Sequence, residues 1–425
     1  MKEMIANMRA TLFKIWTGED SLLVNSFFLF GILIATSGFG FLVWIAATRF
    51  YLPADVGMAT TIISTSQMLT GLAGLGLGMG LIKFLPASDD PARMVNAALI
   101  FTVLATLTAS LVYVLGAPVW SPSLAFLTSR WQLLVGFVVC APIFGSYSLI
   151  QMVFQAMRKS KYGFWLVIAI NLPRLLLTIV LARWGAAGII LAVVAGMLPA
   201  ILLGLFVYLP RVMPDYSIMK SINLSYLRQL IPFSLGVHIA LQMYQLPILL
   251  TPLLVMERLG PAQSANAYIA WMLGALIFSA GQAIAGSAYA EGSHDLQQFT
   301  PVFKRSLRLS FWITCGFALV LGFGAPWVLS LFGEAYQMAV PLLVWMALAA
   351  PLVSMNRVHF SRMQIFQQMK ELIGLAVLST VIFLAAFFLL VDRAGLIAVG
   401  MGWLLAQGVV YALCAGKFLL DGVRK

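Results

Sequence analysis

Twelve runs of about twenty apolar residues alternate with short polar connections along the chain. A helix needs about 20 apolar residues to cross a hydrocarbon core about 30 Å thick. Strict alternation of apolar and polar residues is absent, and a backbone inside hydrocarbon must satisfy its own hydrogen bonds, so helices are expected rather than barrel strands. The predicted spans are Leu22–Ala47, Ala54–Leu85, Val95–Leu115, Leu133–Met157, Phe164–Leu181, Ala187–Leu209, Leu230–Met256, Ala267–Ala290, Leu309–Leu331, Ala339–Val358, Leu372–Val391 and Ala394–Leu419.

The composition agrees with a chain that crosses a bilayer repeatedly. Hydrophobic residues make up 62% of the 425 residues and charged residues only 9%. A typical soluble domain is about 25% charged. We therefore predict an all-α polytopic membrane protein whose twelve helices form two parallel six-helix repeats around a central cavity.

The Lys and Arg residues indicate the orientation of the spans, because cytoplasmic loops carry an excess of basic residues. With both termini cytoplasmic, twenty of the 26 basic residues lie on the inner side. The five outer ones are Arg49, Arg130, Arg183, Arg258 and Arg393, and Arg174 lies within a span. The net charge of +12 follows from this asymmetry and suits an anionic leaflet, so nucleic acid is not an expected partner.

The longest polar connection follows the sixth span and divides the chain. The predicted parts are an N-terminal cytoplasmic segment at 1–21, a first six-helix bundle at 22–209, a linker at 210–229, a second bundle at 230–419 and a cytoplasmic tail at 420–425. Apolar residues on one face of the N-terminal segment suit either an interfacial helix or a partly ordered tail.

A short internal similarity relates the two halves. Pro53-Ala54 in RFYLPADVGMA and Pro261-Ala262 in RLGPAQSANA lie 208 residues apart. Each pair follows an outer arginine and precedes an even-numbered span. Because each half has six spans, both halves enter the membrane in the same orientation, and this favours parallel repeats, a plan common among transporters.

Residues that carry enzyme chemistry are not visible. The outer acids Asp55, Glu257, Glu334 and Asp392 lie on four different loops, and no nucleotide or hydrolase motif occurs. The Asp89-Asp90 pair suits a solvated turn more than a metal site. Three cysteines, all within spans and without a CxxC pair, suggest apolar packing. We expect no catalytic residue, metal or cofactor.

Polar residues inside the spans are the candidates for function, because they are costly in hydrocarbon. Span two carries small and polar residues at helical spacing, which predicts one continuous stripe: Thr60, Ser64, Gln67, Gly71, Gly74 and Gly78. Span eight carries a matching stripe at the 208-residue offset: Tyr268, Met272, Ala275, Ser279, Gln282 and Gly286. Close helix packing would explain the glycines, whereas a cavity lining explains the glutamines better.

Spans one and seven add further polar faces. Span one offers Asn25, Thr36 and Ser37, and span seven offers Ser234, His238, Gln242 and Gln245. Pro247 and Pro252 should kink or break the outer end of span seven. His238 has two interpretations, a titrating group or a hydrogen-bonded packing residue.

Arg174 in the sequence NLPRLLLTIV is the strongest single clue to the cargo. It follows Pro173 near the middle of span five, and no acidic residue lies at comparable depth in any span. Its guanidinium would either snorkel or bind carbonyls freed by Pro173, or it would hold a phosphate or pyrophosphate. Cation-coupled drug exporters normally carry a buried carboxylate, so the interior suits an anionic or sugar-bearing cargo better than a cationic drug.

The stretch ATRFYLPADVGMATTIISTSQMLTGLAGLGLGMGLIKFLP, at residues 47–86, resembles the first-repeat signature of Wzx-type oligosaccharide flippases. The stretch ERLGPAQSANAY, at residues 257–268, resembles the second-repeat signature. These proteins form the polysaccharide biosynthesis branch of the multidrug/oligosaccharidyl-lipid/polysaccharide exporter superfamily. The chain departs from lipid II flippases, which usually have fourteen spans and several cavity arginines.

The resemblance implies two six-helix bundles around a cavity lined by spans one, two, seven and eight, in the bacterial cytoplasmic membrane. It implies a cargo of undecaprenyl-pyrophosphate-linked oligosaccharide, moved by alternating access for lipopolysaccharide or exopolysaccharide synthesis. Membrane lipids, a polysaccharide polymerase and a chain-length regulator are the expected partners. The expected substrate-binding residues are Arg174, Lys83, Arg49, Arg258, Asn25, Gln67, His238, Gln242, Gln245, Tyr268 and Gln282.

Three other functions stay open from the sequence. A cation-coupled multidrug exporter would share the fold, and drug-resistance assays would separate the two. A membrane polysaccharide polymerase or glycosyltransferase is disfavoured by the short outer loops. A scaffolding role leaves the paired polar stripes unexplained.

Overall fold

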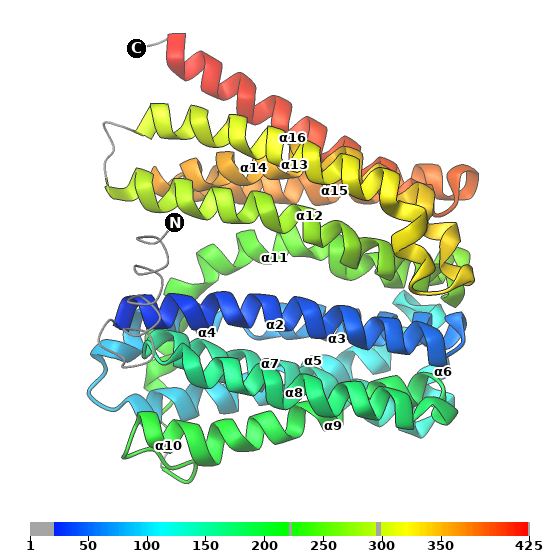
Figure 1. Cartoon of the computed structure of the whole chain (residues 1–425). Coiled ribbons are helices and arrows are strands. Elements are labelled where there is room, and N and C mark those ends of the chain that lie inside the picture. Colours follow the sequence, from blue (N-terminus) through cyan, green and yellow to red (C-terminus); the bar gives the residue numbers. More distant parts are fainter. Residues whose placement is uncertain (1–20, 221–222, 295–298, 424–425) are drawn as a thin grey trace, which may run out of the picture. The chain divides into compact units, whose positions relative to one another are not determined.

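The computed structural model describes residues 21–220, 223–294 and 299–423, which form helices, turns and bends (Figure 1). Eleven of the described helices are long and apolar enough to cross a membrane, and a bent pair of helices supplies a twelfth. The twelve spans predicted from hydropathy are therefore confirmed. The predicted interfacial helix and the last two residues of the tail lie outside the described residues.

Contacts group the chain into two compact units. The first unit comprises residues up to Phe50, Leu69–Trp120 and Leu124–Leu235, and the second comprises Tyr51–Met68, Ser121–Ser123 and Gly236 onwards. Three described helices therefore contribute to both units: α3 (Pro53–Ala73), the short η2 (Pro122–Leu124) and α11 (Ser225–Leu259). The predicted division into bundles at 22–209 and 230–419 stays a prediction.

The first unit holds most helices of the first half of the chain. In it, α2 packs on α8, α8 on α9, and α7 on α4, α5 and α9. Its elements are α2 (Ser21–Phe50), α4 (Leu77–Phe84), η1 (Leu85–Ala87), α5 (Pro91–Trp120), α6 (Phe126–Ser129), α7 (Trp131–Ala156), α8 (Ser160–Val180), η3 (Ala182–Trp184), α9 (Ala186–Leu203), the π-helical η4 (Gly204–Tyr208) and α10 (Leu209–Val212).

The second unit is built around α14, which packs against α12, α13 and α16. Buried Ala347, Ala349 and Ala350 give α14 the small surface that close packing between membrane helices requires. Besides its part of α3 and α11, the unit contains α12 (Pro261–His294), α13 (Phe299–Ser330), η5 (Glu334–Ala339), α14 (Val340–Ile365), α15 (Met369–Ala394) and α16 (Ile397–Val423).

The second span is broken, so its predicted continuous stripe is wrong beyond Ala73. The helices α3 and α4 are bent by 52° relative to each other. Leu75 and Gly76 between them have φ values of 48° and 69°, a left-handed backbone that ends the helix. The glycine-rich sequence around this point lowers helix propensity, which explains why the break falls here.

For span seven the expectation is a kink or a break at Pro247 and Pro252, and the structure shows no break. The helix α11 continues through Pro247 and Pro252 to Leu259 and is not broken. Pro247 has no N–H to donate to the Met243 carbonyl four residues before it, and the hydroxyl of Thr380 on α15 donates to that carbonyl at 2.7 Å instead. Such side-chain donors allow prolines inside membrane helices.

The two Pro-Ala pairs that suggested a repeat both begin helices. Pro53 is the first residue of α3 and Pro261 the first residue of α12, a position that tolerates the missing N–H of proline. Both helix starts lie in the second unit, where Thr61 and Ser264 are hydrogen-bonded to each other at 2.9 Å. The sequence match therefore reflects matching local structure.

Candidate functional site

The second unit contains a polar pocket with a volume of about 200 Å³ between α11, α12, α14 and α15. Its lining combines aromatic, amide, hydroxyl and guanidinium groups, and none of the lining residues, all of which the structure describes, is acidic. The lining residues are Ala240, Leu241, Tyr244, Gln282, Ala285, Gly286, Tyr289, Arg357, Phe360, Ser361, Gln364, Leu372 and Ala376.

Arg357 is the charged group of this pocket. Its guanidinium carbon lies 3.9 Å from the ring centroid of Tyr244, a stacking geometry that favours a cation by interaction with the π face. Tyr244 is buried, and its ring also meets Phe360 edge-on at 5.9 Å. The aromatic platform is therefore fixed by packing, and Arg357 above it is only half-buried.

The walls of the pocket are held together by close contacts between α12 and α14. A Cβ on Gly281 would lie 2.2 Å from the hydroxyl oxygen of Ser354, so only glycine permits this approach. One turn further along, Ser361 donates a hydrogen bond to the Ala285 carbonyl at 2.9 Å. These contacts set the spacing between Gln282 on α12 and Arg357 on α14.

Of the predicted site residues in the second unit, only Gln282 lines this pocket. Gln282 is exposed on α12, one turn before Gly286, as the predicted stripe of span eight requires. His238, Gln242 and Gln245 lie on α11 beside the lining residues Leu241 and Tyr244 but are not part of the lining. Gln67 on α3 and Tyr268 on α12 lie outside it as well.

In the first unit, Arg174 lies on α8 against the ring of Trp44 on α2. Its guanidinium carbon is 5.8 Å from the centroid of the indole ring, within the range of a cation–π contact. The side chain is half-buried, and the backbone of α8 continues through Pro173. A Cβ on Gly196 would lie 2.9 Å from the Cβ of Arg174, so α9 also approaches the residue closely.

Lys83 and Asn25 occupy different surroundings in the same unit. The ammonium of Lys83 lies 3.9 Å from the centroid of the Phe233 ring, and the side chain is exposed. The amide oxygen of Asn25 accepts a hydrogen bond from the backbone N–H of Ser160 at 3.1 Å. Because Ser160 is the first residue of α8, Asn25 satisfies a helix N-terminus and joins α2 to α8.

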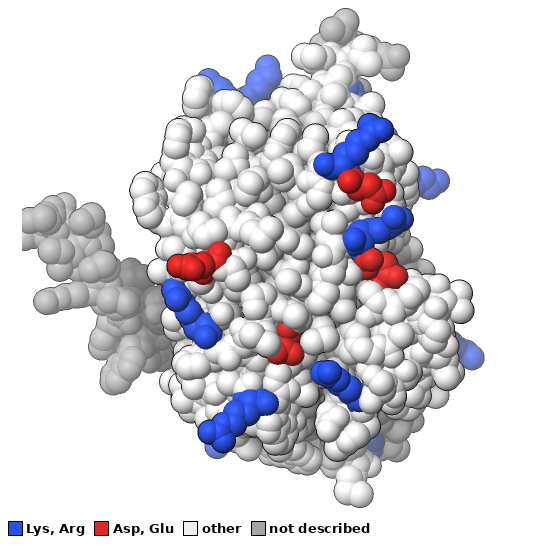
Figure 2. All heavy atoms as spheres, turned by 90° about the vertical axis from the view of Figure 1, so that its right-hand side faces the viewer, with Lys and Arg blue, Asp and Glu red and all other residues white. Residues whose placement is uncertain are grey.

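The two predicted outer arginines are both exposed. Arg49 ends α2, and Arg258 lies near the end of α11, 4.0 Å from a carboxylate oxygen of Asp392 and 5.3 Å from the Phe388 ring centroid. Figure 2 shows one face of the molecule on which charged side chains of both signs are few. The exposed pair of Arg258 and Asp392 contributes little to stability.

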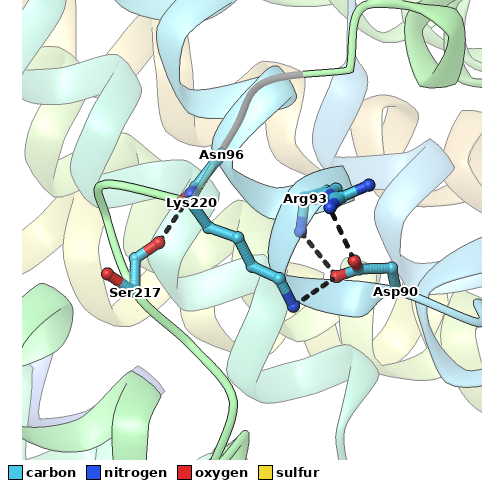
Figure 3. Close-up of polar contacts among 5 residues, drawn as sticks. All are labelled: Asp90, Arg93, Asn96, Ser217 and Lys220. Atoms are coloured by element: carbon cyan, nitrogen blue, oxygen red, sulfur yellow. Dashed lines mark hydrogen bonds and ion pairs between the residues drawn. The ribbon is translucent and has the colours of Figure 1, made fainter.

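The Asp89-Asp90 pair lies in the turn before α5, where Asp90 is paired with two basic side chains. Asp90 accepts a hydrogen bond from the backbone N–H of Arg93 at 3.2 Å (Figure 3). Its carboxylate also forms an ion pair with the ammonium of Lys220 at 3.1 Å. The amide of Asn96 donates to the Ser217 carbonyl at 2.8 Å. The first turn of α5 is thereby fastened to the segment 213–220, and no cluster of potential metal ligands occurs among the described residues.

The same contacts set the acidity of Asp90. Partial desolvation raises the pKa of its carboxyl, but the hydrogen bond from Arg93 and the ammonium of Lys220 outweigh this effect. The pKa of Asp90 therefore lies below its ordinary value. The carboxylate is ionised at neutral pH and holds both basic side chains.

Sequence reasoning missed Arg357 and a buried polar network beside it. Asn356 donates to the side-chain oxygen of Gln407 at 3.0 Å, and Gln407 donates to Ser379 at 3.2 Å. These contacts join α14, α16 and α15 inside the second unit. The signal was the run NRVH at 356–359, where polar residues continue the helical spacing of α14 past the apolar stretch.

Comparisons with known proteins agree with this architecture. The family model described as polysaccharide biosynthesis protein matches residues 22–290, and no curated protein matches the chain. A lipid II flippase, MurJ, in an inward closed conformation is similar over 94% of this chain and 87% of its own, with a TM-score of 0.75 and 10% identity. An inward-facing multidrug resistance MATE family transporter of the MOP superfamily is similar over 92% of this chain and 95% of its own, with a TM-score of 0.69 and 14% identity.

A third solved structure is a MOP superfamily transporter from Pyrococcus furiosus, for which a reversed polarity of the binding pocket is reported to suggest a different function. It covers 95% of this chain and 96% of its own, with a TM-score of 0.65 and 13% identity. At these identities the solved structures establish the fold alone.

Proposed function

This chain belongs to the family of polysaccharide biosynthesis proteins, and from that premise we propose that it moves a lipid-linked oligosaccharide across the membrane. The cargo is an oligosaccharide on undecaprenyl pyrophosphate, carried from the cytoplasmic to the periplasmic leaflet of the bacterial inner membrane. Its product supplies the synthesis of a surface polysaccharide, either a lipopolysaccharide or an exopolysaccharide. The family match covers more than half of the chain, and the structure is that of a multi-pass membrane protein.

The observation that carries the proposal is the polar, basic pocket within a bundle of membrane helices. A sugar head group carries many hydroxyl groups, and each costs several kcal/mol to place in hydrocarbon without a hydrogen-bond partner. Gln282, Gln364 and Tyr289 offer such partners at the pocket. A polyprenyl tail has no such need and stays in the lipid.

The charge of the described interior supports an anionic cargo. Arg174 in the first unit and Arg357 in the second are half-buried guanidinium groups, and each lies against an aromatic ring. A guanidinium matches the geometry of phosphate and carboxylate oxygens. In this proposal Arg174 and Lys83 attract the pyrophosphate, Arg49 and Arg258 lie near the outer exit, and the amide side chains bind sugars.

The test is complementation of a deletion strain that accumulates lipid-linked oligosaccharide in the inner leaflet. The wild-type chain should restore surface polysaccharide, and Arg174→Ala should restore less than about a tenth of it at equal protein abundance, because one charge-assisted contact contributes about 1.5–3 kcal/mol. Arg183→Ala, a substitution at the outer connection after the same helix, is the matched control and should restore the wild-type level.

Two results would contradict the proposal. If deletion leaves surface polysaccharide unchanged and instead sensitises cells to cationic drugs, the chain is a multidrug exporter. If deletion shortens the polysaccharide chains without accumulation of the lipid-linked repeat, a polymerase role is indicated. A normal level of polysaccharide with Arg174→Ala at normal abundance would remove the role assigned to Arg174.

A further inference from the structure

We propose that the pocket around Arg357 is a subsite for an oxyanion of the cargo, either a carboxylate of an acidic sugar or a phosphate. The inference rests on the proposed function, since it specifies which part of a glycan cargo the second unit holds. The pocket lies between α11, α12, α14 and α15, and Arg357 supplies its positive charge. Nothing in the sequence pattern had assigned a binding role to this residue.

The first argument is the placement of the charge. Arg357 lies eight residues before the end of α14, within the helix, and not in the connection that follows Ile365. A charge within a membrane helix is costly and faces a cavity or a partner. The guanidinium carbon lies 3.9 Å from the centroid of the Tyr244 ring, and this contact stabilises the cation through one face. The N–H groups lie in the plane of the guanidinium and point away from that face.

The second argument is the chemistry of the surrounding lining. Gln282 and Gln364 each provide an amide donor and acceptor, and the exposed Tyr289 provides an aromatic surface. None of the lining residues, each of them described, is a carboxylate that would neutralise Arg357 from within the pocket. An oxyanion flanked by hydroxyl groups matches this set, whereas an organic cation would meet a like charge.

The third argument is size. The cavity of about 200 Å³ is smaller than the about 300–1,000 Å³ of pockets that enclose a whole small ligand. It therefore suits one charged group of a larger cargo and not the complete oligosaccharide. The walls are also rigid at the point of binding, because Gly281 packs on Ser354 and Ser361 is bonded to the Ala285 carbonyl.

The predicted topology places this subsite toward the cytoplasmic ends of its helices. The helix α14 ends at Ile365 and α15 begins at Met369, in a connection assigned to the inner side, and the lining residue Leu372 lies in the first turn of α15. A cargo arriving from the cytoplasmic leaflet would meet this subsite early. The subsite therefore acts in loading.

The experiment measures binding of soluble probes to the purified full-length protein in lipid nanodiscs. Glucuronate presents a sugar carboxylate, inorganic pyrophosphate presents a phosphate oxyanion, and glucose presents hydroxyl groups alone. We expect glucuronate, pyrophosphate or both to bind the wild-type protein at least about tenfold more tightly than glucose, because a charge-assisted contact is worth about 1.5–3 kcal/mol. If Arg357→Gln loses binding of glucuronate alone, an acidic sugar is the source of the oxyanion, and if it loses binding of pyrophosphate alone, the source is the lipid headgroup.

Variants assign the binding to this pocket. Arg357→Gln should weaken binding of the oxyanion probe at least about tenfold. Arg357→Lys should retain an intermediate affinity, because lysine keeps the charge but lacks the planar set of N–H donors of a guanidinium. The matched control is Arg362→Gln, one turn away on α14 and outside the lining, which should leave binding unchanged. Equal binding by Arg357→Gln, or preference of the wild-type protein for glucose, overturns the proposal.

The outcome is separable from that of the proposed function. If Arg357→Gln binds probes like the wild-type protein while deletion of the chain still abolishes surface polysaccharide, the subsite is wrong and the flippase stands. If the subsite binds oxyanions as expected but deletion has no effect on surface polysaccharide, the flippase is wrong. Melting temperatures of both variants, matched to the wild-type value, show that any loss of binding is not a loss of folding.

Discussion

At the scale of single residues, several basic side chains of the described chain lie against aromatic rings. Lys83 lies over Phe233, Arg174 over Trp44 and Arg357 over Tyr244. Such contacts stabilise a cation by about 0.5–2 kcal/mol without neutralising it. The charge of such a side chain still attracts an anionic ligand, because an aromatic ring carries no net charge.

Asp90 gives a prediction at this scale. Its carboxyl has a pKa below the ordinary value, so its contribution to stability is complete above the unfolded pKa and is lost as pH falls through the folded pKa. In detergent, the melting temperature of the wild-type protein should therefore fall between about pH 4 and pH 2 by more than that of Asp90→Asn. Asp89→Asn, at the exposed neighbouring carboxylate, is the control and should keep the wild-type pH profile. An identical profile for Asp90→Asn would show that the contacts of Asp90 with Arg93 and Lys220 do not stabilise the fold.

Candidate site residues were predictable only where the helix boundaries were. Gln282 lies well inside a strongly apolar helix, and its spacing from Gly286 placed it on the correct face of α12. Arg357 was missed because it is the next-to-last residue of the predicted span Ala339–Val358 and was counted with the inner connection. The helix continues to Ile365 because tertiary packing by buried His359, Phe360 and Ser361 extends it past the apolar stretch.

At the scale of elements, helices in the second unit approach each other through glycine. A Cβ on Gly57 of α3 would lie 1.7 Å from the carbonyl oxygen of Pro261 at the start of α12. This contact involves backbone on the opposing side, so no rotamer change can relieve a clash. The hydrogen bond between Thr61 and Ser264 closes the same interface one turn further along α3.

Gly57→Ala should consequently destabilise the protein by about 2 kcal/mol or more, since overpacking typically costs about 1–3 kcal/mol. Gly316→Ala is the matched control, because a Cβ at Gly316 of α13 would meet no atom within 4 Å. It should be neutral or stabilising by up to about 1 kcal/mol, the difference in helix propensity. Unfolding by a denaturing detergent in mixed micelles measures both, and equal stability of the two variants would contradict the close contact.

Hydropathy sufficed for the number and order of the spans, because a crossing helix must be long and apolar wherever it packs. It did not predict the break after Ala73, where Leu75 adopts a left-handed backbone that an ordinary propensity argument disfavours. In α11 the prolines predict a kink or a break, and the helix continues unbroken through Pro247 and Pro252. That outcome depends on the hydroxyl of Thr380 on another helix, α15, which donates to the Met243 carbonyl that Pro247 leaves without a helical donor.

At the scale of the whole molecule, the distribution of basic residues predicts which connections face the cytoplasm. Twenty basic residues lie on one predicted side of the membrane and five on the other. Asp215 in the connection before α11 and Glu334 in η5 are exposed and belong to opposite predicted sides. They are suitable positions for labelling because Cys140, Cys315 and Cys414 all lie within membrane helices.

In intact spheroplasts, a membrane-impermeant maleimide should modify Glu334→Cys and should leave Asp215→Cys unmodified until the membrane is permeabilised. The wild-type chain reports any labelling of its own three cysteines and is the control. Labelling of Asp215→Cys in sealed cells would reverse the predicted orientation. The Arg357 subsite would then face the periplasm, and its role in loading would become one in release.

The break between α3 and α4 carries a consequence for how the bilayer meets the chain. At the break the backbone N–H of Leu77 donates to the carbonyl of Gly74 at 3.2 Å and not to that of Ala73, four residues before it. Hydrocarbon offers a displaced carbonyl oxygen no hydrogen bond, so water or a neighbouring side chain has to supply one. Residues 74–76 therefore mark a point where water reaches the second span. In hydrogen–deuterium exchange, the amides of these residues should exchange well before those of the continuous helices α3 and α4 on either side.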